Sequence, residues 1–447
     1  MRALDISYEL KQKAGIVVLP PGSGKTRIAA EGAKRYSAKR ILYVAHTYEI
    51  LDVAKSEFEA VFDTKSVVVH ESGASLEKPK RANLATIQLL ARNIRNIKRG
   101  MFDYLIVDEF HHAAAMTYRV LMDKIQPGFL LGLTATPFRG DRQNILELCG
   151  DNLLVNFELR AGIECGILAP YHYWGCFDDI DYSSIRHNGI RYDIRDLEKA
   201  LVIPERDAAI ISKWRVRAED KPTIAFCVSH RHASRIGESF NAEGIPAAPY
   251  LSTTTSRERA RLLERFRAGK LKVLCVVDVL NEGADIPFVE CLLFLRPTES
   301  HRIFYQQLGR GLRKYVGKPF CTVIDFIGNF KNAYKIVEYQ DLLPIPGGEV
   351  MTALSRSHNP KEVLDLPVGC RVEFEDRVID VFARQVLDPR TATRHNIGKI
   401  LLYQYERLRK RLGRSPTKRE VDRASLLDSQ FYSLVFGSWE RFQLIAQ

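Results

Sequence analysis

Short apolar runs alternate with longer amphipathic segments through the first 160 residues of the chain. Runs rich in Val, Ile and Leu predict strands, and the amphipathic stretches between them are long enough to form helices. This alternation is typical of a parallel sheet in which a helix follows each strand. The strands are expected at residues 16–19, 40–45, 66–69, 104–107 and 129–133.

A second block with the same alternation begins after Pro170. It contains a helical pattern at residues 256–266, for which Ser256 is the expected N-cap. The polar, turn-rich stretch 178–188 is expected to form an exposed insertion. The strands of this block are expected at residues 223–228, 248–251, 273–277, 291–294 and 321–326.

The alternation breaks near residues 345–348, and the chain then changes character. Irregular sequence follows, with one short strand expected near 371–374. Helical spacing returns in the last segment, where Gly413 is a helix stop and Ser415 or Thr417 caps the next helix. We therefore expect an α/β fold of two doubly wound parallel-sheet domains with a small helical module. The predicted parts are residues 1–160, 161–345, a connector at 346–395, and the module at 396–447.

Composition narrows the class of protein. The chain has 447 residues, of which 46% are hydrophobic, and it contains no apolar run near the roughly twenty residues of a membrane span. Its start lacks the apolar core of a signal peptide, so we expect an intracellular protein of the cytoplasm or nucleoid without a membrane partner. The eight cysteines form no CxxC pair and no zinc-ligand spacing, which favours buried free thiols in a reducing compartment.

The net charge of +12 suits a polyanionic partner, and its distribution is uneven. From Arg390 to the end there are 12 Lys and Arg residues against 5 Asp and Glu residues, a difference of +7. The final segment is therefore the first place to look for a nucleic-acid contact.

A glycine-rich loop follows the first predicted strand and leads into a helical pattern. Backbone N–H groups of such a loop turn onto phosphate oxygens at the positive end of a helix dipole. The lysine then reaches the terminal phosphates, and the following hydroxyl can ligate Mg²⁺. The loop consists of Pro21, Gly22, Ser23, Gly24, Lys25 and Thr26.

Two carboxylates end the predicted strand at 104–107. Asp108 is placed to hold a metal ion, and Glu109 to orient or deprotonate an attacking water. Both the glycine loop and this pair follow strands, and ligands of doubly wound sheets bind at the carboxyl ends of strands. Together the two motifs predict hydrolysis of a nucleotide with the help of Mg²⁺.

The chain resembles superfamily 2 helicases and translocases, because eight segments match the family motifs in the family order across roughly residues 15–330. Asp108 to His111 match the DExH form of motif II, and the resemblance implies two RecA-like domains. The other matching segments are the glycine loop, 42–47, 85–88, 134–137, 225–229, 278–287 and 306–313.

The resemblance assigns roles to three residues of the last motif. Gln306 would contact the γ-phosphate or water, and Arg310 and Arg313 would stabilise charge on the transferred phosphoryl group. The two arginines are three residues apart, so they share one face of a helix. Reaching the nucleotide from a separate domain would link hydrolysis to domain motion. The alternative is that both arginines form ion pairs at a sheet edge.

Further roles follow from the same resemblance. His111, Thr134 and Thr136 would couple the nucleotide and nucleic-acid sites, although a buried structural histidine and helix-capping threonines are the alternatives. Gly283 would allow close approach of the backbone to the nucleotide, or serve a plain turn, and Asp285 would lie near the ribose. His112 is expected to be structural.

Nucleic acid is expected to contact loops at the ends of the strands and the basic tail. Such contacts grip phosphates and do not read sequence, and each side chain could instead be simply solvated. Residues 412–417 and 436–439 of the tail resemble the small helical repeat found beside homing endonucleases, and this resemblance implies DNA binding. The aromatic residues of the tail are expected to form a core. The candidate contacts are His46, Thr86, Ser229, His230, Arg231, Arg409, Lys410, Arg414, Lys418 and Arg419.

These observations predict an ATP-dependent motor that moves on or remodels duplex or branched DNA, as a monomeric or weakly associating chain. An RNA helicase would share every motor motif. A motor subunit of a restriction or defence complex would need a nuclease partner. A non-catalytic nucleotide-binding module is disfavoured because Lys25, Glu109 and Arg313 are all present.

Overall fold

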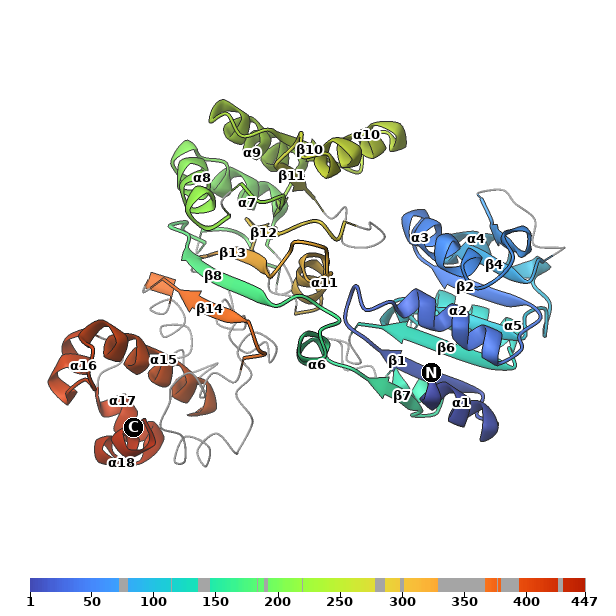
Figure 1. The fold of residues 1–447 in the computed structure, drawn as a ribbon, viewed down its shortest axis with the longest axis horizontal. Helices are drawn as coiled ribbons and strands as arrows, with labels where there is room; N and C mark the ends of the chain where they lie inside the picture. The colour runs from blue at the N-terminus through green and yellow to red at the C-terminus, as the bar shows by residue number, and fades with distance from the viewer. Residues whose placement is uncertain are drawn as a thin grey trace. The chain divides into compact units, whose positions relative to one another are not determined.

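The fold was determined as a computed structural model of the chain (Figure 1). The structure describes residues 1–71, 79–113, 115–135, 145–182, 184–188, 192–218, 220–277, 286–297, 301–328, 366–375, 377–378, 394–424 and 429–446.

Contacts divide the chain into two compact units. The first unit consists of Met1–Leu168 together with Leu280–Pro287 and Arg302–Tyr315. The second consists of Ala169–Val279, Phe288–His301 and Val316–Gln447. The division after residue 168 lies eight residues beyond the predicted boundary at 160, and the segment of the last motif is grouped with the first unit.

A seven-stranded sheet, parallel in every described pair, forms the centre of the first unit. All five predicted strands are present, and each end lies within two residues of its predicted position. Two more were missed, because Ala82–Thr86 has few β-branched residues and Leu153–Asn156 is a half-exposed edge strand. In the order β3-β4-β2-β5-β6-β1-β7, the strands are β1 Ala14–Val18, β2 Ile41–Ala45, β3 Val67–Val69, β4 Ala82–Thr86, β5 Tyr104–Val107, β6 Phe129–Thr134 and β7 Leu153–Asn156.

Alternate residues of these strands enter two separate cores, one on each face of the sheet. On β2, Tyr43 packs in a cluster with α1, α2 and α3, whereas Leu42 and Val44 pack in a cluster with α4 and α5. Helices α1 to α5, blue to cyan in Figure 1, thus cover both faces of the sheet, and α6 follows β7. The helices of this unit are α1 Arg2–Glu9, α2 Lys25–Arg35, α3 Tyr48–Glu59, α4 Ile87–Arg92, α5 Met116–Ile125 and α6 Leu159–Glu164, with short 3-10 turns at Thr64–Ser66, Ile94–Asn96, Phe110–His112 and Leu146–Cys149.

A second seven-stranded parallel sheet forms the centre of the second unit, with the order β10-β11-β9-β12-β13-β8-β14. The expected strand at 371–374 is confirmed as β14, and it extends this sheet by pairing with β8. The strands are β8 Tyr171–Phe177, β9 Thr223–Phe226, β10 Ala247–Tyr250, β11 Val273–Val276, β12 Cys291–Phe294, β13 Cys321–Ile327 and β14 Arg371–Phe374.

Helices α8 and α9 pack on one face of the second sheet through Ile210, Trp214, Ala233 and Phe240. The expected cap of α10 was wrong by one residue, because the Thr255 side chain accepts the hydrogen bond from Glu258 N and Ser256 is the first helical residue. The helices are α7 Ile194–Leu201, α8 Pro204–Ala218, α9 His230–Ala242, α10 Ser256–Arg267 and α11 His301–Gly311.

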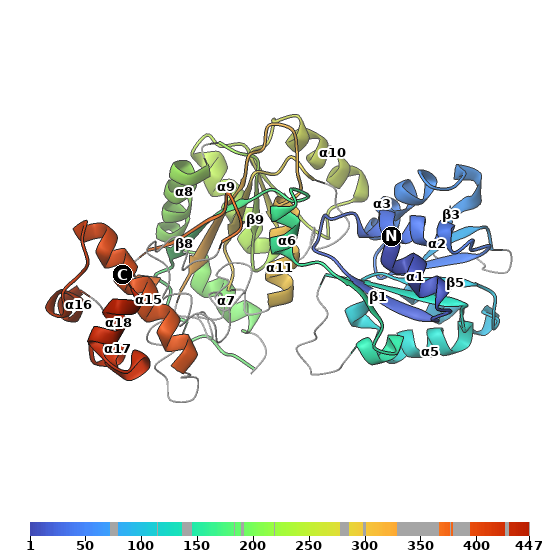
Figure 2. The same cartoon turned by 60° about the horizontal axis from the view of Figure 1, so that its bottom comes forward.

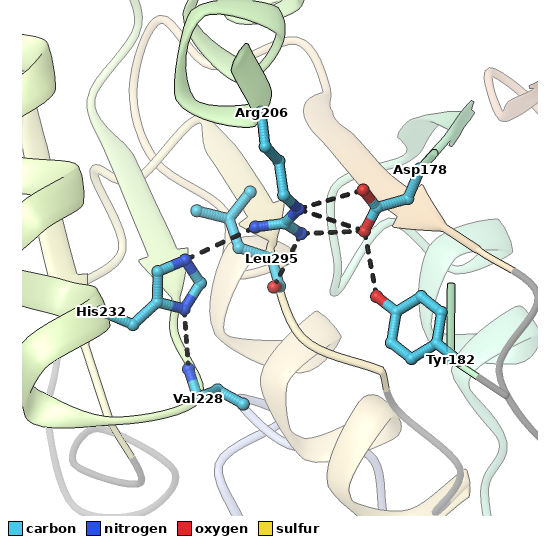
Figure 3. A network of polar contacts seen from close by, with 6 residues as sticks. All are labelled: Asp178, Tyr182, Arg206, Val228, His232 and Leu295. Atoms are coloured by element: carbon cyan, nitrogen blue, oxygen red, sulfur yellow. Dashed lines mark hydrogen bonds and ion pairs between the residues drawn. The ribbon is translucent and has the colours of Figure 1, made fainter. Parts of the chain in front are cut away.

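The polar stretch predicted as an exposed insertion at 178–188 is partly buried (Figure 3). Asp178 is 3% exposed because it receives the guanidinium of Arg206 from α8, with Arg206 Nη2 2.9 Å from Asp178 Oδ2. Tyr182 donates to the same carboxylate at 3.0 Å, and Arg206 also donates to Leu295 O. On the other side Arg206 meets His232, whose pKa falls to about 3 through burial and the two nearby arginines. This network joins the ends of β8 and β12 to α8 and α9.

The C-terminal segment, red in Figures 1 and 2, forms the expected group of helices around an aromatic core. Gly413 has a φ of +67° directly after α15, which confirms the helix stop. Thr417, not Ser415, caps α16, and Glu420 returns a bond to Thr417 N to complete a capping box. The core contains Tyr405, Tyr432, Phe436, Trp439 and Phe442. The helices are α15 Arg394–Leu412, α16 Lys418–Ala424, α17 Ser429–Phe436 and α18 Trp439–Ile445.

Across the part of the chain that the structure describes, every helix is too short or too polar to cross a membrane. The cysteines are all free thiols, and those in strands β8, β11, β12 and β13 are buried, as expected from their apolar neighbours.

Candidate functional site

Three predicted site segments meet at one edge of the first sheet. Strands β1 and β5 lie on either side of β6. Because all three are parallel, the glycine loop after β1, Asp108 after β5 and Thr134 at the end of β6 lie at the same carboxyl edge. The backbone ties the loop to this edge, since Leu19 N donates to Thr134 O at 3.0 Å.

The glycine loop has the backbone of a phosphate cradle. Gly22 and Gly24 both have a φ of +83°, a conformation that side chains rarely adopt, and α2 begins directly afterwards at Lys25. Ser23 Oγ donates to Pro20 O at 2.6 Å, which tightens the turn. Lys25 Nζ donates to Leu19 O at 3.2 Å, so the ammonium lies folded back over the loop that it would serve.

Asp108 is held on both carboxylate oxygens. Its Oδ1 accepts from Glu109 N at 2.9 Å, and its Oδ2 accepts from the Tyr43 hydroxyl at 2.5 Å. The side chain is 8% exposed. Burial and the neighbouring Glu109 raise the pKa of Asp108, while Lys25 and the Tyr43 hydrogen bond oppose the rise.

Glu109 and His111 form a buried pair beside Asp108. His111 Nδ1 lies 3.2 Å from Glu109 Oε2 and 3.4 Å from Thr134 Oγ1. Glu109 has a φ of +47°, so the chain turns sharply at this residue before the 3-10 turn. Burial acts to raise the pKa of Glu109, but His111, Lys25 and His46 outweigh it and lower the pKa to about 2. Glu109 is therefore a carboxylate near neutral pH.

The turn that carries Glu109 and His111 packs tightly against β6. A Cβ on Gly132 would lie 2.6 Å from the ring of Phe110, which is fully buried. Only a glycine at position 132 allows Phe110 to lie on the strand beside Thr134. The contact fixes the spacing between Asp108-Glu109 and the end of β6.

Helix α11 packs against the glycine loop within the first unit. A Cβ on Gly309 would lie 2.5 Å from Cβ of Pro21, and a Cβ on Gly22 would lie 2.7 Å from Cγ of Arg313. The backbone of Arg313 also forms an isolated antiparallel bridge with Leu168. These close approaches place Arg313 beside the loop.

Gln306 and Arg310 are buried on this helix, at 6% and 7% exposure. The Gln306 amide nitrogen makes no hydrogen bond to any residue that the structure describes. A buried amide without a partner is costly, so its position suits a group that arrives with a ligand.

The donor set fits ATP and Mg²⁺. Apart from the two chain neighbours of Gly24, no described atom lies within 4 Å of the position that a Cβ would take on this residue. Thr26 and Asp108 supply hydroxyl and carboxylate oxygens, which Mg²⁺ prefers.

Two family models match the chain. Residues 2–139 match the type III restriction enzyme res subunit, and residues 207–315 match the helicase conserved C-terminal domain. The two matches fall on the glycine loop with Asp108-Glu109 and on the second sheet with α11. The chain therefore carries regions similar to both domains of helicases and translocases.

Curated relatives of this helicase-type chain come from several kinds of organism. IRC3 of Saccharomyces cerevisiae is 24% identical, with 70% of this chain and 48% of the relative covered. A 51.5 kDa protein of a Lactococcus phage is 28% identical over 70% of this chain and 65% of its own length. The DNA 3'-5' translocase XPB2 of Sulfurisphaera tokodaii is 26% identical over 68% and 76%. The chain spans about half to two thirds of the length of the first two.

Solved helicase-type structures share the fold. The ATP-dependent type ISP restriction-modification enzyme LlaBIII, bound to DNA, aligns with a TM-score of 0.61 at 14% identity, covering 92% of this chain and 34% of that chain. The Hef helicase domain of Pyrococcus furiosus aligns with a TM-score of 0.50 at 16% identity, covering 75% and 97%. The expected pair of RecA-like parallel-sheet domains is confirmed.

The predicted nucleic-acid contacts of the helicase-type chain differ in whether their side chains already make hydrogen bonds within the protein. Thr86 is 4% exposed and caps α4 by accepting from Leu89 N. Ser229 caps α9, and His230 Nε2 lies 3.4 Å from Ser252 Oγ. Arg231 is exposed. These residues remain predicted contacts. Among them, Arg231 has an exposed, positively charged side chain.

In the tail, the five predicted basic contacts fall into two groups. Arg409 pairs with Glu406 at 3.4 Å, and Arg414 pairs with Glu420 at 2.6 Å. Lys410, Lys418 and Arg419 are exposed, and no ion pair links them to a described residue. These three side chains are the ones best able to reach phosphates.

Sequence reasoning missed Tyr43, whose hydroxyl reaches Asp108. A tyrosine in the middle of an apolar strand, beside a strand that ends in Asp, was the available signal. His112 was treated as structural, and its ring lies 4.2 Å from that of His111 and 5.4 Å from that of His46, centre to centre. The predicted coupling residue Thr136 and the predicted nucleotide-binding residues Gly283 and Asp285 lie outside the described residues.

Proposed function

We propose that this chain is an ATP-driven motor that moves on or remodels duplex or branched DNA. The observation that carries the proposal is the cluster of Lys25, Asp108, Glu109, His111 and Thr134 at one edge of the first sheet. The cluster combines a phosphate loop with an ionised buried carboxylate. The helicase C-terminal domain match adds the second motor domain.

In the proposed reaction the glycine loop and Lys25 bind the β- and γ-phosphates. Thr26 and Asp108 would hold Mg²⁺, which supplies charge neutralisation for the phosphates. Glu109, kept ionised by His111 and Lys25, orients the attacking water and accepts its proton. Arg310 and Arg313 would stabilise the charge that develops on the γ-phosphoryl oxygens.

The basic tail supports DNA as the track. It holds +7 of the net charge of +12, and Lys410, Lys418 and Arg419 are open to a polyanion. Relatives named for DNA translocation and restriction support the same substrate. RNA helicases share the motor motifs, so RNA is the competing substrate.

A motor subunit of a restriction or defence complex is the second candidate. It is favoured by the match of residues 2–139 to the type III restriction res subunit model. A type I restriction endonuclease subunit of Escherichia coli, EcoAI, is 26% identical over 70% of this chain and 44% of its own length. Under this candidate the nuclease lies on a partner, which copurification of the tagged full chain from its host would reveal.

One experiment tests the proposal and its alternatives. ATP hydrolysis is measured with single-stranded, duplex and four-way DNA and with RNA at one salt concentration, using Lys25→Ala as the blank. Strongest stimulation by duplex or four-way DNA is expected. Strongest stimulation by RNA would replace DNA as the substrate, and hydrolysis equal to that of the Lys25→Ala variant would overturn the motor.

A further inference from the structure

Tyr43 contacts Asp108, one of the two residues predicted to hold the magnesium ion. It lies in the middle of β2, in register with Ile106 of the neighbouring strand β5. Its ring is fully buried and packs edge-on against Phe58 of α3, with the ring centres 5.5 Å apart. Because the two strands are parallel and Asp108 follows β5, the long Tyr43 side chain can span from its strand to the carboxylate.

The phenol hydroxyl of Tyr43 donates to Asp108 Oδ2 at 2.5 Å. An ionised carboxylate cannot donate, so the phenol supplies the proton of this bond. One hydroxyl from β2 thus contacts the carboxylate that follows β5.

Asp108 has little freedom once this bond is made. Its other oxygen, Oδ1, accepts from Glu109 N at 2.9 Å, so both oxygens are oriented by donors from the protein. Hydrogen bonds to a charged acceptor are stronger than neutral ones, and a buried carboxylate has no water to replace a lost donor. Removing the phenol hydroxyl therefore releases one of the two bonds that orient this carboxylate.

We propose that Tyr43 is a positioning residue for the magnesium site, and that its hydroxyl sets Asp108 in place before the metal ion arrives. The inference rests on the proposed function, because it gives Asp108 its role. Tyr43 does not touch the reacting atoms. Its contribution is the orientation of the groups that do, as expected of the side chains that support metal ligands.

Tyr43→Phe in the full chain tests the proposal, since it removes the hydroxyl and keeps the buried ring. The readout is binding of a fluorescent ADP analogue, titrated with MgCl₂ from an EDTA-treated baseline. We expect binding without Mg²⁺ to match the wild type, and the Mg²⁺ concentration at half-maximal enhancement to rise about tenfold. Thermal melting without nucleotide checks that the variant folds.

Tyr104→Phe is the matched control. Tyr104 is fully buried in the same core, and its hydroxyl bonds to Tyr8 of that core at 2.8 Å. Its Mg²⁺ midpoint should equal that of the wild type. Phe58→Leu controls for packing of the Tyr43 ring, because it disturbs that contact and spares the hydroxyl.

The outcomes separate the inference from the proposed function. Equal Mg²⁺ midpoints for the wild type and Tyr43→Phe, with normal ADP binding, would overturn only the positioning role. A similar rise in Phe58→Leu would also overturn it, since packing would then explain the effect. A wild-type chain that binds no ADP analogue would overturn the proposed function, and the positioning role with it.

Discussion

His111 and Glu109 form a buried acid–imidazole contact, with His111 Nδ1 3.2 Å from Glu109 Oε2. His111 is 1% exposed and also meets Thr134 Oγ1 at 3.4 Å. The imidazole therefore touches the carboxylate of one motif and the hydroxyl of another. A movement of Thr134 at the end of β6 can therefore be transmitted to Glu109, the proposed water-orienting residue, through the side chain of His111.

Glu109→Gln should keep nucleotide binding and reduce ATP turnover by about a hundredfold or more, because the amide cannot accept a proton from water. Binding of a fluorescent ADP analogue and steady-state hydrolysis measure the two effects separately. His111→Asn serves as a companion variant, and its loss of turnover should be smaller because the carboxylate remains. Near-normal hydrolysis in Glu109→Gln would remove this residue from the reaction.

Arg206→Met should lower the free energy of unfolding by about 3–5 kcal/mol, because it leaves the buried carboxylate of Asp178 without its cation. Arg35→Met is the matched surface control, since Arg35 pairs with Asp5 at 2.6 Å but is half-exposed. That change should cost less than about 1 kcal/mol. Urea unfolding of both variants measures the difference, and equal losses would contradict the role of burial.

Asp325 should make stability depend on pH. Burial raises its pKa from 3.8 to about 7, with Asp178 adding to the rise and the Tyr173 hydrogen bond opposing it. Between pH 4 and 7 the unfolded carboxyl ionises while the folded one keeps its proton. The free energy of unfolding then falls as pH rises, by about 1.4 kcal/mol per pH unit and about 4 kcal/mol in total.

Asp325→Asn removes this titration, so its stability relative to the wild type should improve from pH 4 to pH 7 and then level off. Urea unfolding at several pH values gives both curves. Parallel curves for the two proteins would show that the carboxyl ionises equally in the folded and unfolded states.

The double variant Lys418→Gln and Arg419→Gln should weaken DNA binding and reduce the dependence of log affinity on log salt by about 2, if each side chain releases one counterion. Lys98→Gln with Arg99→Gln removes the same charge from exposed positions in the first unit and should leave the slope unchanged. Fluorescence anisotropy with labelled duplex DNA at several salt concentrations provides the slopes. Equal slopes for the two double variants would count against the tail.

Sequence periodicity was sufficient for most of the fold, because the strands that it identified are buried apolar runs. It failed at β4, where Asn83 stands in the middle of the strand. The structure explains this residue, since Asn83 Nδ2 donates to Ile41 O at 3.1 Å and Oδ1 meets His70 Nε2 at 3.1 Å. A buried polar residue with partners far along the chain cannot be recognised from local pattern.

The site was predictable where a motif is local and less so where it depends on contacts. Gly22, Gly24 and Lys25 follow from the loop sequence alone. The Tyr43 bond to Asp108 joins residues 65 apart, and burial of Asp178 depends on Arg206 28 residues away. A charged or polar residue is buried only where the fold brings it a hydrogen-bonding or charged partner. The order of strands in the sheet determines which residue that partner is.

The contact between Phe110 and Gly132 also has an evolutionary consequence. A ring at one position excludes any side chain at the other, since an added Cβ would lie 2.6 Å from it. Among related chains, a smaller residue at 110 would permit an alanine or serine at 132, whereas phenylalanine at 110 would require glycine. The two positions should therefore covary, and an alignment of homologues would reveal them as a pair inherited together.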